Sequence, residues 1–271
     1  MRNILVLGAD GMLGSQLVDY FHNLKNYNLS YTSRREAQNH NVISFDIMKN
    51  NIEDLDNIKN FDYIINCIGI IKPLIDTNTI NSIYINSIFP LKLANFCEKN
   101  NIKLIHITTD CVYSGKKGKY KEDDEHDCID YYGKSKSLGE PKNCMVIRTS
   151  IIGKEKNNFL SLISWVLSQK NKSINGFKNH LWNGVTTNYL AEIIHNIIDQ
   201  NLFVKNLVHI YSPNDVSKFE LLNYINNKFS LNISINNVNA DHPVDRTLRS
   251  MQNLSKNIVI KDIEKQINEL I

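Results

Sequence analysis

Short apolar runs alternate with amphipathic patterns over the first 150 residues of the chain. The strand-like runs lie at residues 4–7, 27–32, 41–45, 63–68, 103–107 and 144–147. Apolar positions at helical spacing follow the first run, and a second helical pattern covers residues 83–99. Near-continuous apolar strands separated by helices are typical of a parallel sheet that helices cover on both faces. We therefore predict a doubly wound, Rossmann-like α/β domain over residues 1–150.

The pattern beyond residue 150 is looser and predicts a smaller lobe over residues 151–271. Helical patterns cover residues 159–166 and the stretch that begins at Thr187, and residues 207–211 form a strand-like run. Thr187 can cap its helix, while Ser217 and Glu220 have the spacing of a capping box for the next helix. We expect this lobe to close over the carboxyl edge of the sheet, with a boundary that is interleaved in sequence.

The composition excludes several classes of protein but does not indicate a reaction. Hydrophobic residues make up 42% of the chain and charged residues 22%, which excludes a disordered protein. There are 31 Lys and Arg against 28 Asp and Glu, a net charge of only +3, so we expect neither nucleic acid nor an anionic membrane as a partner. No stretch approaches the roughly 20 apolar residues of a membrane span. The N-terminal apolar run is too short for a signal peptide.

The five cysteines and eight histidines predict no metal site. No two cysteines have the two-residue spacing of a metal knuckle, and no histidines pair at ligand spacing. An odd number of cysteines, some of them in apolar runs, indicates free thiols in a reduced, cytoplasmic protein.

A glycine-rich motif directly follows the first apolar run. Gly8, Gly11 and Gly14 have the spacing Gly-x-x-Gly-x-x-Gly and open the first helical pattern. Such a turn lets a dinucleotide pyrophosphate approach the backbone, and free amides at the helix N-terminus bind its phosphates. We predict that the motif contacts a cofactor along its length, which adds Asp10, Met12 and Leu13. The alternative is a glycine turn that binds nothing.

Basic residues follow the second run, where an acid usually accepts a hydrogen bond from the ribose 2′-hydroxyl of NAD. Ser33, Arg34 and Arg35 occupy these positions, and arginines there pair with the 2′-phosphate of NADPH. We therefore expect NADPH to be preferred, with NADH possible; a solvated loop is the alternative. Asp46, at the end of the third run, either accepts a hydrogen bond from the adenine amine or only shapes a turn.

A second group of polar residues marks the expected site of chemistry. Thr109 follows the fifth run, at the sheet edge where ligands bind in this fold. Tyr132 and Lys136 are four residues apart, so they share one face of a helix. A lysine charge beside a tyrosine favours the phenolate and lowers the tyrosine pKa from its ordinary value of about 10. Such a pair suits acid–base catalysis at neutral pH.

Together these motifs resemble the extended short-chain dehydrogenase/reductases, and within them the nucleotide-sugar 4-ketoreductases related to dTDP-4-dehydrorhamnose reductase. The resemblance rests on the glycine motif, Asn86 in segment 84–90, segments 109–113 and 118–122, the Tyr132/Lys136 pair and segment 147–150. It covers residues 1–150 closely, and the rest loosely through residues 183–186 and 246–250.

The resemblance implies a role for each of several residues. Thr109, Tyr132 and Lys136 take the catalytic positions, and Lys136 also holds the nicotinamide ribose. Asn86 supports the site through the helix backbone or a water. Further cofactor contacts fall on Ile47, Cys67, Ile68 and Gly69. Contacts to the sugar nucleotide fall on Lys72, Thr109, Asp110, Cys111, Trp182 and Arg246. Arg246 lies near the diphosphate in this scheme, and core packing is the alternative for Trp182.

The implied function is NADPH-dependent reduction of the 4-keto group of a nucleoside-diphosphate-linked 6-deoxy sugar, for a bacterial surface polysaccharide. Cys111 stands where the related 4,6-dehydratases carry an acid, which disfavours dehydration. Residues 66–72 are more apolar than is usual beside the nicotinamide, which leaves the shape of the substrate pocket open. Two other functions stay open: an NAD-retaining epimerase, and a non-catalytic subunit like the regulatory subunit of methionine adenosyltransferase. A homodimer is compatible with the resemblance.

Overall fold

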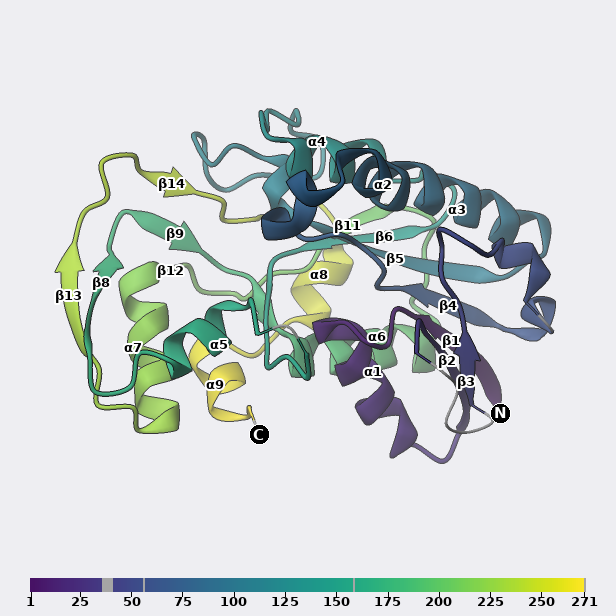
Figure 1. Ribbon diagram of the computed structural model, residues 1–271, viewed down its shortest axis with the longest axis horizontal. Helices are drawn as coiled ribbons and strands as arrows, with labels where there is room; N and C mark the ends of the chain where they lie inside the picture. Colours follow the sequence, from purple (N-terminus) through teal and green to yellow (C-terminus); the bar gives the residue numbers. More distant parts are fainter. Residues whose placement is uncertain (36–40, 56, 158, 271) are drawn as a thin grey trace. The chain divides into compact units, whose positions relative to one another are not determined.

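The computed structural model describes residues 1–35, 41–55, 57–157 and 159–270. Among these residues, seven strands form one sheet in the order β11-β6-β5-β4-β1-β2-β3 (Figure 1). Their bounds are β1 Arg2–Leu7, β2 Tyr27–Ser33, β3 Val42–Ser44, β4 Tyr63–Asn66, β5 Lys103–Thr109, β6 Met145–Thr149 and β11 Leu207–His209. The pairs that join β3, β2, β1, β4 and β5 are parallel. The predicted doubly wound, Rossmann-like fold is therefore confirmed.

The other elements are short and lie between these strands or after them. The helices of the described residues are α1 Met12–His22, α2 Thr79–Ile83, α3 Phe89–Lys99, α4 Tyr131–Leu138, α5 Leu162–Leu167, α6 Thr187–Asp199, α7 Lys218–Phe229, α8 Asn253–Ile258 and α9 Ile263–Asn268. The small strands are β7 Ile151–Ile152, β8 Ser173–Phe177, β9 His180–Trp182, β10 Val185–Thr186, β12 Val216–Ser217, β13 Ser234–Val238 and β14 Val244–Asp245. They form the small sheets β10-β7, β12-β9-β14 and β13-β8.

The chain divides into two compact units that are interleaved in sequence. Unit 1 contains Met1–Thr108, Ile129–Ile147 and Ile194–Leu207. Unit 2 contains Thr109–Cys128, Arg148–Ile193 and Val208–Ile271. The functional division at residue 150, with a sugar-nucleotide lobe after it, stays a prediction.

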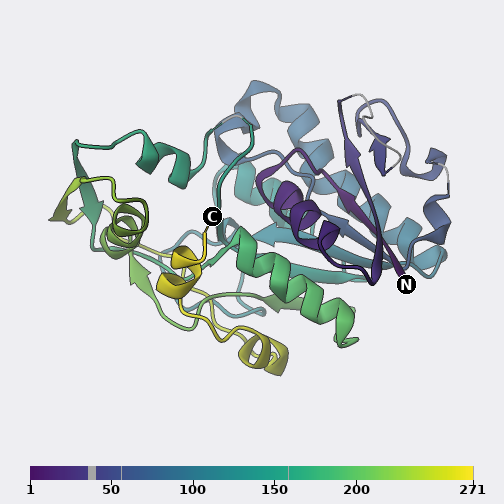
Figure 2. The same ribbon diagram turned by 90° about the horizontal axis from the view of Figure 1, so that it is seen from below.

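The central strands of unit 1, β1, β4 and β5, are buried along most of their length. α1 lies on one side of the sheet, and α3 and α4 lie on the other (Figures 1 and 2). Leu5, Ile64, Leu93 and Leu104 are at most 1% exposed and pack in one core beneath α3. The order of the strands reverses between β1 and β4, since β2 and β3 lie beyond β1 while β5 lies beyond β4. Ligands bind at such a switch point in open parallel sheets.

The helix expected over residues 83–99 begins earlier and contains a π-helical turn, Tyr84–Ile88. Pro90 has no N–H with which to bond the Asn86 carbonyl four residues earlier, so the regular α-helical ladder cannot continue there. The amide of Phe89 instead bonds the carbonyl of Tyr84, five residues back. Single π turns of this kind are frequent at functional sites.

Unit 2 has its own apolar core, formed largely by α5, α7 and α9. Ile163, Ile225 and Ile263 are fully buried in it. The predicted capping box at the start of α7 is confirmed: the Glu220 amide donates to Ser217 Oγ over 3.2 Å, and the Ser217 amide donates to Glu220 Oε2 over 2.7 Å.

Two expected details of this half of the chain are wrong. α6 is capped by Thr186, whose Oγ1 accepts a hydrogen bond from the Tyr189 amide over 3.3 Å, because the chain enters the helix directly from β10. Thr187 Oγ1 is buried without a hydrogen-bond partner among the described residues. The helix expected at 159–166 begins only at Leu162, because Phe159 has a left-handed φ of +52° and Ser161 caps the helix.

Candidate cofactor and catalytic site

The glycine motif forms a tight turn between β1 and α1. At two positions of this turn, Gly8 and Gly14, only glycine fits. Gly8 has a φ of +84°. A Cβ atom on Gly14 would lie 2.1 Å from the carbonyl oxygen of Gly8, so the first turn of α1 packs directly on the loop. Gly11 is the N-cap of α1, and no side chain caps this end of the helix. The first turn of α1, which is described in full, contains no acidic residue. The amides of this helix end therefore suit a pyrophosphate.

Asp10 in the same loop extends to the end of β2. Its Oδ2 accepts a hydrogen bond from Ser33 Oγ over 2.8 Å and from the Arg34 amide over 3.2 Å. Arg35 Nε lies 3.8 Å from Asp10 Oδ1, and the side chains of both arginines are exposed. The structure thus brings Asp10 next to Ser33, Arg34 and Arg35, which follow it by more than 20 positions in the sequence.

The remaining predicted cofactor contacts lie after β3 and β4. Asp46 shapes a turn, since its Oδ1 accepts a hydrogen bond from the Met48 amide over 3.0 Å, and Ile47 is buried beside it. A contact of Asp46 with adenine stays a prediction. Cys67 and Ile68 follow β4 and lie against Gly8, whose Cβ would be 3.0 Å from Ile68 Cγ1. Burial raises the pKa of the Cys67 thiol to about 12, so it is a neutral thiol at physiological pH.

α4 carries Tyr132 and Lys136, as the spacing of the pair predicts. Asp130 caps its N-terminus, because its Oδ1 accepts a hydrogen bond from the Gly133 amide over 2.9 Å. The other oxygen of Asp130 forms an ion pair with Lys72 Nζ over 2.9 Å. Lys72, predicted to contact the substrate, thus pairs with the capping carboxylate two residues before Tyr132.

Lys136 is a buried cation whose pKa is lowered. It is 6% exposed, and its Nζ donates a hydrogen bond to the carbonyl of Ile107 on β5 over 3.1 Å. Burial lowers the pKa of Lys136 to about 8, although the nearby Glu140 and Cys67 raise it. Gly69 lies close by, since a Cβ on it would be 3.5 Å from Lys136 Nζ. The amine is therefore poised between its charged and neutral forms near physiological pH.

Asn86 joins three elements with its side chain. Its Oδ1 accepts a hydrogen bond from the Ile70 amide over 2.8 Å, and its Nδ2 donates to the Ile70 carbonyl over 3.0 Å. The same Nδ2 donates to Ser135 Oγ on α4 over 3.1 Å, and Ser87 Oγ donates to the Ser135 carbonyl over 2.7 Å. The Asn86 side chain thus fixes both the loop after β4 and the helix α4. Its support of the site through the helix backbone or a water stays a prediction.

The residues around Thr109 belong to unit 2. Thr109 is the last residue of β5, and its Oγ1 donates to Asp110 Oδ1 over 3.2 Å and accepts from the Cys111 amide over 3.1 Å. Asp110 is 3% exposed, and burial raises its pKa, although the charge of Arg246 lowers it. Arg246 Nε donates to the carbonyl of Tyr113 over 2.9 Å. The predicted catalytic threonine therefore contacts a buried carboxyl group whose pKa the charge of Arg246 lowers.

Trp182 is half-buried at the end of β9 and packs against the apolar core of unit 2. The ring also lies against Gly184, whose Cβ would be 2.3 Å from Trp182 Cζ2. Core packing, the alternative weighed for this residue, is therefore observed, and a contact with the sugar stays a prediction.

The structure thus sorts the predicted residues by unit. Unit 1 holds the glycine motif, the residues after β2, β3 and β4, and Asn86, Tyr132 and Lys136, while unit 2 holds Thr109, Asp110, Cys111, Trp182 and Arg246. Sequence reasoning missed Ser135 and Glu140 around the Tyr/Lys helix. It also missed that Asp10 places an acid at the end of β2. No local motif signals these contacts.

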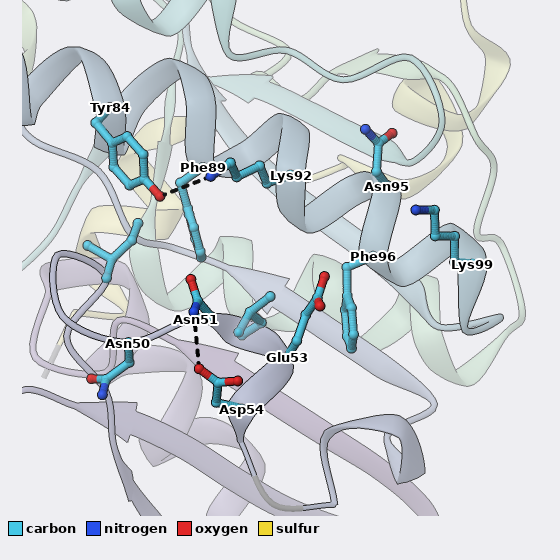
Figure 3. Close-up of a pocket in the computed structure, with 12 residues that line it drawn as sticks. Asn50, Asn51, Glu53, Asp54, Tyr84, Phe89, Lys92, Asn95, Phe96 and Lys99 are labelled. Atoms are coloured by element: carbon cyan, nitrogen blue, oxygen red, sulfur yellow. Dashed lines mark hydrogen bonds between the residues drawn. The ribbon is translucent and has the colours of Figure 1, made fainter.

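A groove of about 470 Å³ lies elsewhere in unit 1 (Figure 3). It is lined on one side by Ile47 and residues 50–54. On the other side it is lined by residues of the π-helical turn and of α3, namely Tyr84, Phe89, Lys92, Asn95, Phe96 and Lys99. Ile47 is its one lining residue with a predicted role, so the groove does not coincide with the predicted site of chemistry. Among the described residues no cluster of metal-ligating side chains occurs, and no helix is long and apolar enough to cross a membrane.

The fold, the glycine loop and the helix with Tyr132 and Lys136 define an extended short-chain dehydrogenase/reductase. The chain belongs to the RmlD substrate binding domain family, whose family model matches residues 1–264.

Two curated relatives are dTDP-4-dehydrorhamnose reductases. The protein from Aggregatibacter actinomycetemcomitans is 29% identical over 198 residues, which cover 65% of this chain and 60% of that protein. The protein from Mycolicibacterium smegmatis is 27% identical over 146 residues, which cover 51% of this chain and 40% of that protein. The chain therefore spans less than two thirds of the length of these relatives.

A solved structure has the same fold over the whole chain. It is a dTDP-4-dehydrorhamnose reductase from Bacillus anthracis in complex with NADP, with a TM-score of 0.81 and 21% identity. The superposition covers 100% of this chain and 98% of that chain.

Proposed function

We propose that the protein is an NADPH-dependent oxidoreductase that reduces the 4-keto group of a nucleoside-diphosphate-linked 6-deoxy sugar. The observation that carries the proposal is the helix α4, which presents Tyr132 and the buried Lys136 on a Rossmann-like sheet with an open glycine loop. The family and the reductases among the relatives support the same activity.

The glycine loop fits a dinucleotide because its glycines carry no side chains that would keep a pyrophosphate away from the backbone. A side chain at Gly14 would collide with the carbonyl of Gly8, and Gly8 has a positive φ and lies against Ile68. The amides that begin α1 have no side-chain cap. Arg34 and Arg35 offer their guanidinium groups to a 2′-phosphate from the end of β2. NADPH supplies a hydride to the carbonyl carbon when it is bound. NADH remains compatible with the loop.

Within this proposal Tyr132 donates the proton that the reduced carbonyl oxygen needs. Lys136 holds a positive charge next to the tyrosine on the same face of α4, which favours proton release. Its hydrogen bond to the Ile107 carbonyl fixes the ammonium group. Thr109 donates a hydrogen bond to the same substrate oxygen, for which its hydroxyl proton turns away from Asp110 Oδ1, the acceptor that it has in this structure.

The proposed contacts of the sugar nucleotide are Lys72, Asp110, Cys111, Trp182 and Arg246, with Arg246 nearest the diphosphate. The absence of a second acid at Cys111 argues against dehydration. We place the reaction in the cytoplasm and its product in the supply of deoxysugars for a surface polysaccharide.

The test is a screen of NADPH oxidation against a panel of nucleotide-linked 4-keto sugars. We expect consumption of NADPH with at least one 4-keto-6-deoxy sugar, and none with the corresponding sugar that has a 4-hydroxyl group. Purified protein that carries tightly held NAD and consumes no external NADPH would indicate an epimerase instead. Protein that binds neither cofactor would indicate a non-catalytic subunit.

A further inference from the structure

The carboxylate of Asp10 lies at the end of β2, although Asp10 itself belongs to the loop after β1. Two hydrogen bonds hold it there, from Ser33 Oγ over 2.8 Å and from the Arg34 amide over 3.2 Å. The side chain remains 30% exposed, and Arg35 Nε is 3.8 Å away. A negative charge is therefore fixed among the residues that we assign to the 2′-phosphate.

The end of β2 decides between the two nicotinamide cofactors in sheets of this type. An acid there accepts a hydrogen bond from the 2′-hydroxyl of NADH, while basic residues pair with the 2′-phosphate of NADPH. The segment after β2 contains only the basic residues Arg34 and Arg35 up to the last described position. The fold supplies the acid from the glycine loop, so both kinds of group meet at one place.

We propose that Asp10 is a specificity-determining residue that limits the preference for NADPH and lets the site bind NADH as well. This inference rests on the proposed function. A 2′-phosphate beside the carboxylate meets a like charge, which offsets part of its attraction to the arginines. Ser33 donates its hydroxyl proton to Asp10 and so does not offer it to the phosphate. A free 2′-hydroxyl meets no repulsion and can donate to the carboxylate.

The test replaces Asp10 by asparagine, which removes the charge and keeps an oxygen to accept the hydrogen bonds from Ser33 and Arg34. The Kd of NADPH, measured from the fluorescence of the bound reduced nicotinamide, should fall by roughly tenfold, which corresponds to about 1.4 kcal/mol. The Kd of NADH should stay the same or rise. The effect on NADPH should shrink at high salt, because exposed charges are screened.

A matched control and a second probe distinguish an effect of the Asp10 charge from an effect on the fold. Asp19→Asn makes the same change of net charge on an exposed position of α1 and should leave the ratio of the two Kd values unchanged. Adenosine 2′,5′-bisphosphate and 5′-AMP report the phosphate alone through their effect on the thermal unfolding temperature. Only the bisphosphate should stabilise Asp10→Asn more than the wild type.

The outcomes distinguish this inference from the function on which it rests. A Kd ratio in Asp10→Asn within twofold of the wild-type ratio overturns the role of Asp10 and leaves the reductase standing. Equal changes for both cofactors also overturn it, because they mean that Asp10 only shapes the loop. Wild-type protein that binds neither NADPH nor NADH overturns the proposed function itself.

Discussion

At the scale of single residues, the proposed chemistry depends on side chains whose pKa or hydrogen-bond partners are set by their surroundings in the fold. Lys136 is the clearest case, because burial lowers its pKa to about 8. The Tyr132/Lys136 pair and the glycine motif could be predicted from sequence, since each is a local pattern with a physical meaning. The contacts of Asp10 with Ser33 and of Asn86 with Ser135 could not, because they join residues 23 and 49 positions apart.

Replacing Tyr132 by phenylalanine tests the proton donor. The ring is kept and only the hydroxyl is lost, so kcat for the keto sugar should fall by roughly 10²–10⁴, the usual range for acid–base catalysis. The Kd of NADPH should change little. Near-normal turnover would exclude Tyr132 as the donor. Tyr113 is a poor substitute, because it is fully buried and its hydroxyl donates to the Lys121 carbonyl over 2.7 Å.

The arginines after β2 are tested by replacing Arg34 and Arg35 together with alanine. Hydrogen bonds to charged groups are typically worth about 1.5–3 kcal/mol, so the Michaelis constant for NADPH should rise by at least about tenfold. The constant for NADH, which has no 2′-phosphate, should barely move. Equal losses for both cofactors would show that the two residues only shape the loop. Single variants need not add, because the two side chains are neighbours.

The buried amine predicts an unusual dependence of stability on pH. Lys136 has a pKa of about 8 in the folded protein against an ordinary value of 10.5, so the unfolded chain binds more protons between these two pH values. The free energy of unfolding should therefore rise with pH across this window, by roughly 3 kcal/mol in all. Below about pH 8 the full penalty for burying the charge is present.

Lys136→Met isolates this contribution. The variant should be more stable than the wild type at pH 7 without cofactor, and its advantage should shrink from about pH 8 to 10.5. Urea unfolding of both proteins at several pH values measures the difference. A difference that does not change with pH would mean that Lys136 keeps its ordinary pKa in the folded protein.

At the scale of elements, the helix α4, which carries Tyr132 and Lys136, is held against the π-helical turn Tyr84–Ile88. Gly139, just after α4, packs so closely that a Cβ on it would lie 1.9 Å from the Asn86 carbonyl oxygen. This is the carbonyl that Pro90 leaves without its usual helical donor. Sequence periodicity predicted a helix here but not its π turn, because the turn depends on Pro90 and on a neighbour about 50 residues away.

Gly139→Ala therefore tests the fit between the two elements. Gly139 has a φ of −91°, which suits any residue, so the effect is steric and not a matter of backbone strain. Overpacking typically costs about 1–3 kcal/mol, and the shift of α4 should lower kcat more than it raises the Michaelis constant for NADPH. Leu138→Ala, at the exposed neighbouring position, should stay within about 0.5 kcal/mol of the wild type. Equal stability of the two variants would contradict the close approach.

At the scale of the whole molecule, the parallel sheet could be predicted because its strands are apolar on both faces and follow one another regularly. The second half of the chain was predicted less well. Its strands have two to five residues, and details such as the cap at Thr186 depend on which strand leads into which helix. The interleaving of the two units divides the predicted site, since Thr109 and Lys136 belong to different units.

The most direct test of the central claim follows the hydride itself. NADPH carrying deuterium at C4 of the nicotinamide, in the transferred position, is incubated with the nucleotide-linked 4-keto-6-deoxy sugar that the panel identifies. Mass spectrometry and proton NMR then locate the label in the product. The account predicts one deuterium per molecule, on C4 of the sugar, and almost none with Tyr132→Phe over the same time. A reduced sugar without deuterium at C4, or NADPH that stays unconsumed with every 4-keto sugar, would contradict it.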